Sequence, residues 1–167
     1  MATLRRLTPD DLPQIHRLEA ETYLPSLHES DEAFLRIIDL FPDGAVGLFD
    51  GDELCAYAFA VPLPVGSVLE LKAPLRELPP RADMLYIHDV AVGERHRGRG
   101  LATRLVDAML DLARARGMRT SGLVSVQGSA PFWQRFGFRR VEEFEYAPGA
   151  PATKMTLALD APLSDRQ

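Results

Sequence analysis

The sequence of 167 residues has one cysteine, no long apolar segment and no excess of positive charge. An internal disulfide needs two cysteines, so Cys55 excludes one, and it excludes a cysteine-rich metal site as well. No apolar run approaches the roughly 18 residues of a membrane-spanning helix, so no membrane partner is predicted. The opening residues MATLRRLTPDD lack the apolar core of a signal peptide, and we expect a cytoplasmic protein.

The net charge and the histidine spacing argue against two further kinds of protein, a general nucleic-acid binder and a metalloprotein. The formal net charge is −5, which disfavours general nucleic-acid binding. The four histidines are scattered, without the i, i+4 pair of a helical metal site, so no metal is expected. The length suits one domain, residues 1–167, with enough volume for a hydrophobic core.

The most informative stretch is residues 84–104, MLYIHDVAVGERHRGRGLATR. It begins like a buried strand, passes through a glycine-bearing turn and opens a helix. The first turn of a helix has free N–H groups and positive potential, which favour an anion. Gly98 and Gly100 would let a diphosphate approach the backbone. Four arginines around this turn also favour a polyphosphate ligand: Arg95, Arg97, Arg99 and Arg104.

The pattern Arg97-x-x-Gly100-x-Ala102 after a strand resembles the pyrophosphate-binding signature of the GNAT superfamily of N-acetyltransferases. A second match follows about 30 residues later, because PFWQRFGF at 131–138 resembles the closing helix and Gly-Phe of that family. The resemblance implies acetyl-CoA as cosubstrate, without a metal. Its diphosphate would be held by the turn residues Arg97, Gly98, Arg99, Gly100, Leu101, Ala102 and Thr103.

The same resemblance implies an α/β protein of GNAT fold: a single mixed, mostly antiparallel sheet of about six or seven strands with helices on both faces. Periodicity and turn residues predict strands at 3–7, 45–49, 54–61, 84–92, 120–127, 141–146 and 153–159. They predict helices at 8–21, 30–41, 101–116 and 129–136, and a polar tail at 160–167.

Residues 62–83 contain five prolines and separate two strands that a short turn would otherwise join. Members of the family of the arylalkylamine N-acetyltransferase type have an extended segment there, beside the acceptor. Two interpretations remain open: a lid or binding loop, and a surface insertion that costs little loop entropy. His28 and Glu29, in a loop beside the expected acceptor pocket, are further candidates for substrate contact.

His88 is the first candidate for the base, because imidazole titrates near neutrality, with an unperturbed pKa of about 6.5. Strand alternation places Tyr86 on the same face. Arylalkylamine N-acetyltransferases have two histidines on this strand, and His88 matches the second while Tyr86 stands at the first. A purely structural strand histidine is the alternative. A regular strand would point Asp89 to the opposite face, although a bulge would reverse that.

The resemblance further implies that the backbone of Val90, Ala91 and Val92 pairs with the pantetheine and stabilises the oxyanion. Trp133 stands where many members have a tyrosine acid, and an indole N–H is too weak an acid for that role. Three explanations remain. A thiolate leaves without an acid, since a thiol has a pKa of about 8.5; Ser129, Tyr86 or a water supplies the proton; or catalysis has been lost.

These observations predict an N-acetyltransferase that moves acetyl directly from acetyl-CoA to the primary amine of a small molecule. An arylalkylamine-like acceptor is favoured, and the protein is expected to be a monomer or homodimer. An acetyl-CoA sensor without turnover is the main alternative. A dinucleotide fingerprint fits less well, because Thr103 occupies the place of its third glycine.

Overall fold

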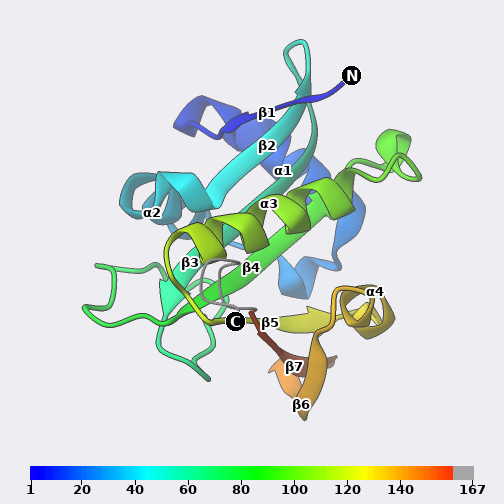
Figure 1. Cartoon of the computed structure of the whole chain (residues 1–167). Helices are drawn as coiled ribbons and strands as arrows, with labels where there is room; N and C mark the ends of the chain where they lie inside the picture. The colour runs from blue at the N-terminus through cyan, green and yellow to red at the C-terminus, as the bar shows by residue number, and fades with distance from the viewer. Residues whose placement is uncertain (160–167) are drawn as a thin grey trace.

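The computed structural model describes residues 1–159 and shows a seven-stranded sheet with helices on both faces (Figure 1). The strands lie in the order β1-β2-β3-β4-β5-β7-β6. Every neighbouring pair is antiparallel except β4 and β5, so the predicted mixed, mostly antiparallel sheet is confirmed. The bounds are β1 Thr3–Arg6, β2 Ala45–Asp50, β3 Glu53–Leu63, β4 Met84–Val92, β5 Thr120–Val126, β6 Arg139–Ala147 and β7 Ala150–Ala158. The expected tail at 160–167 lies outside the described residues.

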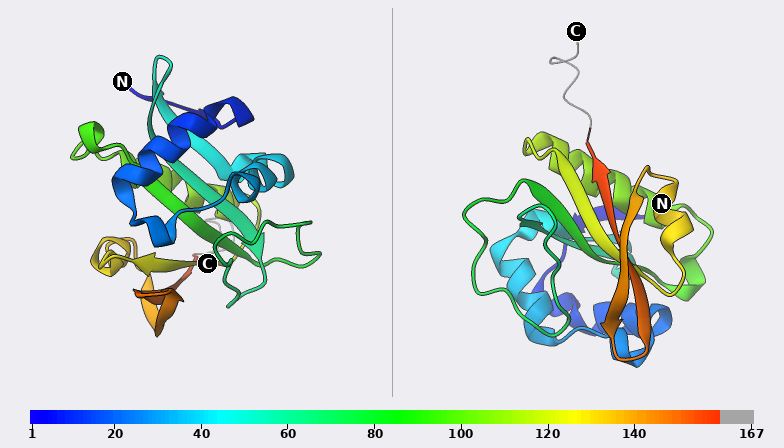
Figure 2. Two further views of the ribbon diagram at one scale, coloured as in Figure 1. Left: turned by 180° about the vertical axis from the view of Figure 1, so that it is seen from behind. Right: turned by 90° about the horizontal axis from the view of Figure 1, so that it is seen from below.

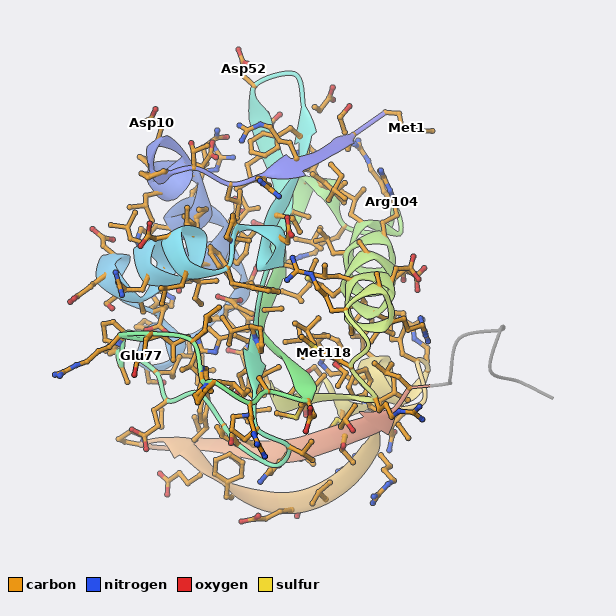
Figure 3. The ribbon with its side chains drawn as sticks, turned by 60° about the vertical axis from the view of Figure 1, so that its left-hand side comes forward. Met1, Asp10, Asp52, Glu77, Arg104 and Met118 are labelled. Carbon is orange, nitrogen blue, oxygen red and sulfur yellow. The ribbon has the colours of Figure 1, made fainter. Side chains whose placement is uncertain are left out.

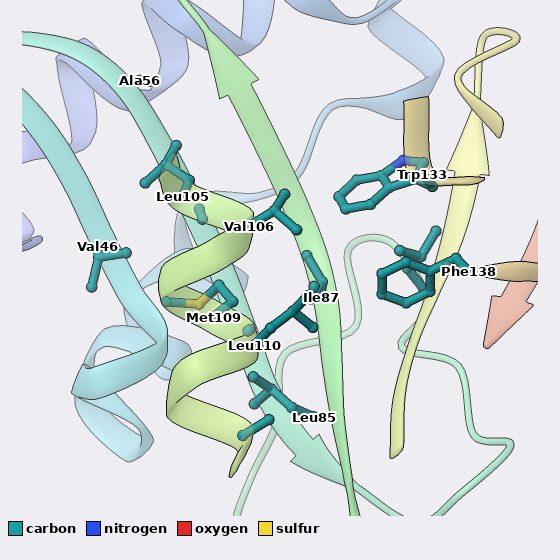
Figure 4. Close-up of a cluster of buried hydrophobic side chains, with 14 of the residues drawn as sticks. Val46, Ala56, Leu85, Ile87, Leu105, Val106, Met109, Leu110, Trp133 and Phe138 are labelled. Atoms are coloured by element: carbon teal, nitrogen blue, oxygen red, sulfur yellow. The ribbon is translucent and has the colours of Figure 1, made fainter. Parts of the chain in front are cut away.

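Two hydrophobic clusters hold the helices to the sheet. Helices α1 (Leu12–Thr22) and α2 (Asp31–Leu40) cover one face, and α3 (Leu101–Ala115) covers the other (Figures 1 and 2). Leu105, Val106 and Met109 of α3 recur at helical spacing and pack against β3 and β4, as Figure 4 shows. The short helix α4 (Ala130–Gln134) follows β5. Within residues 1–159, no helix is both long and apolar enough to span a membrane.

Residues 64–83, between β3 and β4, contain no helix or strand but are fastened to the rest of the chain. Nε of Arg36 in α2 donates to the carbonyl of Leu75 at 2.8 Å, and the hydroxyl of Tyr146 in β6 donates to the carbonyl of Leu69. Figure 3 marks this loop by Glu77. The segment is therefore anchored on both α2 and β6.

Strand β4 contains a β-bulge where it pairs with β3. Phe59 of β3 lies opposite Asp89, while the next residue, Ala60, lies opposite Ile87, so His88 is the extra residue. On the other side, β4 pairs with β5 only from Met84 to Ile87. The bulge that would reverse the side-chain alternation is therefore present, and it starts two residues before the Val90–Val92 segment. Beyond Ile87 the two strands are no longer paired.

Candidate active site

A cavity of about 400 Å³ opens where β4 and β5 separate. Its walls combine the second half of β4, the end of β5, the start of α3 and the helix α4. The predicted site residues that border it are His88, Val90, Val92, Arg97, Ala102 and Ser129. The topology therefore brings residues from the central stretch and from the closing helix to one place.

The turn before α3 has the backbone shape that anion binding requires. Gly98 and Gly100 have φ angles of 80° and 72°, in the left-handed region that favours glycine. Open space lies over both, because a Cβ atom at either position would meet nothing within 4 Å. The first helical bond of α3 joins the N–H of Arg104 to the carbonyl of Gly100 at 3.1 Å, which leaves the preceding N–H groups of the turn for a ligand. These features fit a diphosphate.

The side chains of the four arginines do not all border the cavity beside this turn, although their spacing in the sequence predicts that they share one polyphosphate ligand. Arg95 pairs with Glu53 of the β2–β3 hairpin, and Arg104 donates to the carbonyl of Ala2 at 3.0 Å. Arg99 borders a separate hollow near the N-terminus. Arg97 alone of the four borders the cavity, and it also donates to the carbonyl of Glu21 at 2.8 Å, joining α1 to the turn.

Two of the predicted cofactor residues have side chains in the core. Ala91 is 1% exposed and packs on the α1–α2 side of the sheet. Leu101, the first residue of α3, is 7% exposed and packs in the cluster on the α3 side. Either can contact a ligand through its backbone alone. Gly98, Gly100 and Thr103 lie exposed along the turn.

Asp89 borders the cavity beside His88, so the expectation from a regular strand was wrong. The bulge at His88 breaks the alternation and brings both side chains to the same cavity. The hydroxyl of Tyr57 donates to Oδ2 of Asp89 at 3.1 Å, and Oδ1 is buried without a partner in the described part of the chain. Burial raises the pKa of Asp89 to about 7, with the charge of Glu19 adding to the effect and that of His88 opposing it.

His88 is held by a carboxylate that the sequence did not connect with it. Its side chain is 1% exposed, and Nε2 lies 2.7 Å from Oε2 of Glu29. Nδ1 is buried and has no partner among residues 1–159. The ring of Tyr86 lies nearby at a tilt of 33°, with ring centroids 6.0 Å apart, but Tyr86 is 1% exposed and does not border the cavity. Of the predicted pair, His88 reaches the cavity and Tyr86 does not.

Glu29 joins three segments that are far apart in the sequence. Its Oε1 accepts N–H groups from Lys72 at 2.5 Å and from Ser30 at 3.0 Å, while Oε2 binds His88. Its own N–H donates to Oε2 of Glu19 at 2.7 Å. One buried carboxylate thus fixes the α1–α2 loop, the β3–β4 loop and the β4 bulge relative to one another.

Removal of this carboxylate should destabilise the protein. We expect Glu29→Ala to lower the free energy of unfolding by about 2–4 kcal/mol, because buried donors lose their acceptor. Urea denaturation followed by circular dichroism measures the change. Glu32→Ala, an exposed position in α2, is the control and should change stability by less than about 0.5 kcal/mol. Equal stability of the two variants would contradict the joining role of Glu29.

The α4 side of the cavity combines aromatic and hydroxyl groups. Trp133 borders it, is 8% exposed and packs edge-on against Phe138 at 5.7 Å between centroids. Ser129 also borders it, as does Tyr23, whose hydroxyl donates to the carbonyl of Val90 at 2.7 Å. No sequence pattern indicated a role for Tyr23, which follows α1 in the chain. Within residues 1–159 no group of three His, Cys, Asp or Glu side chains is arranged to bind a metal.

Comparison with known proteins decides the family. Residues 12–138 match the model of the Acetyltransferase (GNAT) family. The chain belongs to this family. Membership confirms the predicted class of enzyme, an acetyltransferase of the GNAT type.

Relatives of this GNAT protein agree on the fold and differ in function. The L-2,4-diaminobutyric acid acetyltransferase of Methylotuvimicrobium alcaliphilum is 31% identical over 110 residues, which cover 65% of this chain and 54% of the relative. The chain thus matches about half of that relative's length. The loading GNATL domain of CurA from Lyngbya majuscula superposes with a TM-score of 0.80 at 16% identity, over 95% of this chain and 98% of that one. Ard1 from Thermoplasma volcanium gives 0.76 at 19% identity, also over 95% and 98%. These structures confirm the GNAT fold.

Proposed function

We propose that this GNAT protein transfers acetyl from acetyl-CoA to the primary amine of a small molecule. The observation that carries the proposal is the cavity between β4 and β5. An anion-binding turn lies at one end of it, and two unpartnered polar atoms, Nδ1 of His88 and Oδ1 of Asp89, are buried in the residues that border it.

Residues Arg97–Thr103 bind the diphosphate in this proposal, and Val90–Val92 offer their backbone to the pantetheine. The left-handed glycines and the free N–H groups of α3 support the first assignment. The end of β4–β5 pairing at Ile87 supports the second, because the following backbone of β4 pairs with β3 on one side and has no partner strand on the side of β5. Acetyl-CoA supplies the thioester, which is activated for attack by an amine.

Asp89 is the proton acceptor that the geometry favours. A base works best when its pKa is near the working pH, and burial brings the pKa of Asp89 to about 7. The free Oδ1 can accept a hydrogen bond from the incoming ammonium group. His88, the base proposed from sequence, keeps a supporting role: Nε2 is bound by Glu29, and Nδ1 is buried without a partner in residues 1–159 and is available to the acceptor.

The thiolate has two protein hydroxyls within reach of the same cavity, Ser129 and Tyr23. Burial raises the pKa of Tyr23 well above its ordinary value, so its hydroxyl stays protonated, and its one proton must turn from the Val90 carbonyl to reach the thiolate. Since a thiol has a pKa of about 8.5, such a donor is sufficient and no strong acid is needed. Tyr86 lies away from the cavity, which leaves Ser129 as the remaining candidate from the sequence analysis.

The arylalkylamine acceptor stays the finer proposal of the sequence analysis. Its support is the pair Phe144 and Tyr146, which border an outer hollow beside the β3–β4 loop. The alternative function is acetyl-CoA binding without turnover, and its support is the absence of the usual tyrosine at Trp133.

Thiol release from acetyl-CoA, followed with a panel of amines, tests the proposal. The panel contains tryptamine, phenethylamine, a polyamine, free amino acids and a lysine peptide, and mass spectrometry of the product locates the acetyl group. Turnover with a small amine is the expected result. Binding of acetyl-CoA by calorimetry without turnover on any amine would favour the sensor, and absence of binding would contradict the assignment of the turn.

A further inference from the structure

Tyr23 is held at both of its backbone polar groups and at its hydroxyl. Its N–H donates to the carbonyl of Glu19 at 2.8 Å, which ends α1, and its carbonyl accepts from Nε2 of His28 at 2.8 Å. The hydroxyl reaches across to β4 and donates to the carbonyl of Val90 at 2.7 Å. The side chain borders the cavity of about 400 Å³ and also a narrow hollow of about 40 Å³, and both reach Asp89. Tyr23 is therefore fixed in the wall of the site where β4 and β5 separate.

Gln127, the residue after β5, fastens the chain on either side of Tyr23. Its Nε2 donates to the carbonyl of Thr22 at 2.9 Å, and its Oε1 accepts the N–H of Leu24 at 2.9 Å. Tyr23 itself is extended, with φ −119° and ψ 147°. One side-chain amide thus pairs with the backbone around Tyr23 much as a neighbouring strand would, and it ties the end of α1 to the end of β5.

The backbone at Gln127 has a conformation that glutamine seldom adopts. Its φ is 53°, and Gly128 follows with a φ of 73°, so two successive residues are left-handed. Glycine adopts this conformation without strain, whereas a residue with a long side chain is strained there. Gln127 is exposed, so packing in the core does not explain a glutamine at this position. Its two hydrogen bonds to the backbone around Tyr23 do explain it, and strain of this kind is frequent at functional sites.

We propose that Gln127 is a positioning residue for acetyl transfer: it holds Tyr23 so that the phenol hydroxyl meets the sulfur of the departing CoA. The proposal rests on the acetyl transfer proposed above. In that reaction the amine nitrogen bonds to the acetyl carbon, the C–S bond breaks with its electron pair on sulfur, and a proton on nitrogen passes to Asp89. The O–H of Tyr23 rotates from the Val90 carbonyl to the sulfur, donates a hydrogen bond and keeps its proton.

Gln127→Gly tests this role without adding backbone strain. Glycine suits a φ of 53°, so the free energy of unfolding in urea should stay close to that of the wild type. The rate of thiol release in a single turnover should fall by up to roughly 10²-fold, the scale of a catalytic group displaced by about 1 Å. Calorimetry should give an unchanged affinity for acetyl-CoA. An unchanged single-turnover rate would overturn the positioning role.

Gln14→Ala is the matched control. Gln14 makes the same pair of bonds elsewhere, because its Nε2 donates to the carbonyl of Asp52 at 3.0 Å and its Oε1 accepts the N–H of Leu54 at 2.8 Å. It borders neither the cavity nor the narrow hollow. This variant should keep the single-turnover rate within about twofold of the wild type. A loss as large as that of Gln127→Gly would show a general effect on stability and overturn the proposal.

A double-mutant cycle with Tyr23→Phe shows whether the glutamine acts through the hydroxyl. Tyr23→Phe should slow the single turnover by a factor similar to that of Gln127→Gly, and the double variant should be slower than Tyr23→Phe by less than about twofold. A full rate in Tyr23→Phe, additive losses in the double variant, or a parallel loss of acetyl-CoA affinity would overturn the positioning role and leave acetyl transfer intact. A wild-type protein without turnover on any amine would overturn both proposals.

Discussion

Asp89→Asn should lower kcat/KM for acetyl transfer by roughly 10³-fold, within the range of about 10²–10⁴ for a general base. The amide keeps the shape and the hydrogen bond from Tyr57 but cannot accept a proton. In the wild type, kcat/KM should rise as the pH passes through about 7, because Asp89 becomes a base only when it loses its proton. That rise should be missing from the variant. Initial rates of thiol release between pH 5.5 and 9 measure both effects.

Two further variants test whether Asp89, rather than another group, is the base. Asp83→Asn changes an exposed carboxyl just before β4 and should leave the pH profile unchanged. His88→Ala should lower turnover moderately and keep the rise near pH 7, because the ring supports the site rather than taking the proton. If instead His88→Ala loses the rise and Asp89→Asn keeps it, the base is His88, as first predicted from the sequence. Calorimetry with acetyl-CoA should give similar affinities for all of these proteins.

Gly100→Val should weaken acetyl-CoA binding by about 30-fold or more, the value of one or two lost charge-assisted hydrogen bonds. A branched side chain is strained at a φ of 72° and would occupy the open space through which a diphosphate approaches the backbone. Isothermal titration with acetyl-CoA measures the affinity.

Gly51→Val is the matched control for backbone strain. Gly51 has a φ of 60° and equally open surroundings, but it lies in the β2–β3 turn and not in the turn before α3. Both variants should lose similar stability in urea, and only Gly100→Val should lose affinity. Unchanged affinity in Gly100→Val would contradict the assignment of the turn to the diphosphate.

The sequence predicted the fold well because its signals are local. The strand, turn and helix of residues 84–115 follow from an apolar run, two glycines and a helical repeat, and each of these is set by neighbours in the chain. The mixed, mostly antiparallel sheet came from family resemblance instead, and the bulge was left open as an alternative to a regular strand. A bulge depends on the register between β3 and β4, and no residue pattern within β4 alone specifies it.

The same limit explains the errors at the site. Asp89 was expected on the opposite face only for a regular strand, and alternation fails at the bulge, which was the open alternative. Glu29 and His88 are 59 residues apart, and nothing in either local sequence indicates their contact. The arginines were assigned to one ligand because they are close in sequence, whereas Arg95 and Arg104 are bound by the β2–β3 hairpin and the N-terminal segment.

The cavity between β4 and β5 and the outer hollow between the β3–β4 loop and β6 have a consequence for the order in which the two reactants bind. Acetyl-CoA would enter between α3 and α4, and the amine would enter between the β3–β4 loop and β6, so each reactant has an entrance of its own. Neither has to depart before the other arrives, and both are present together when the acetyl group moves. The protein then needs no residue to carry the acetyl group in between. Cys55 fits this picture, since it is buried and borders neither entrance.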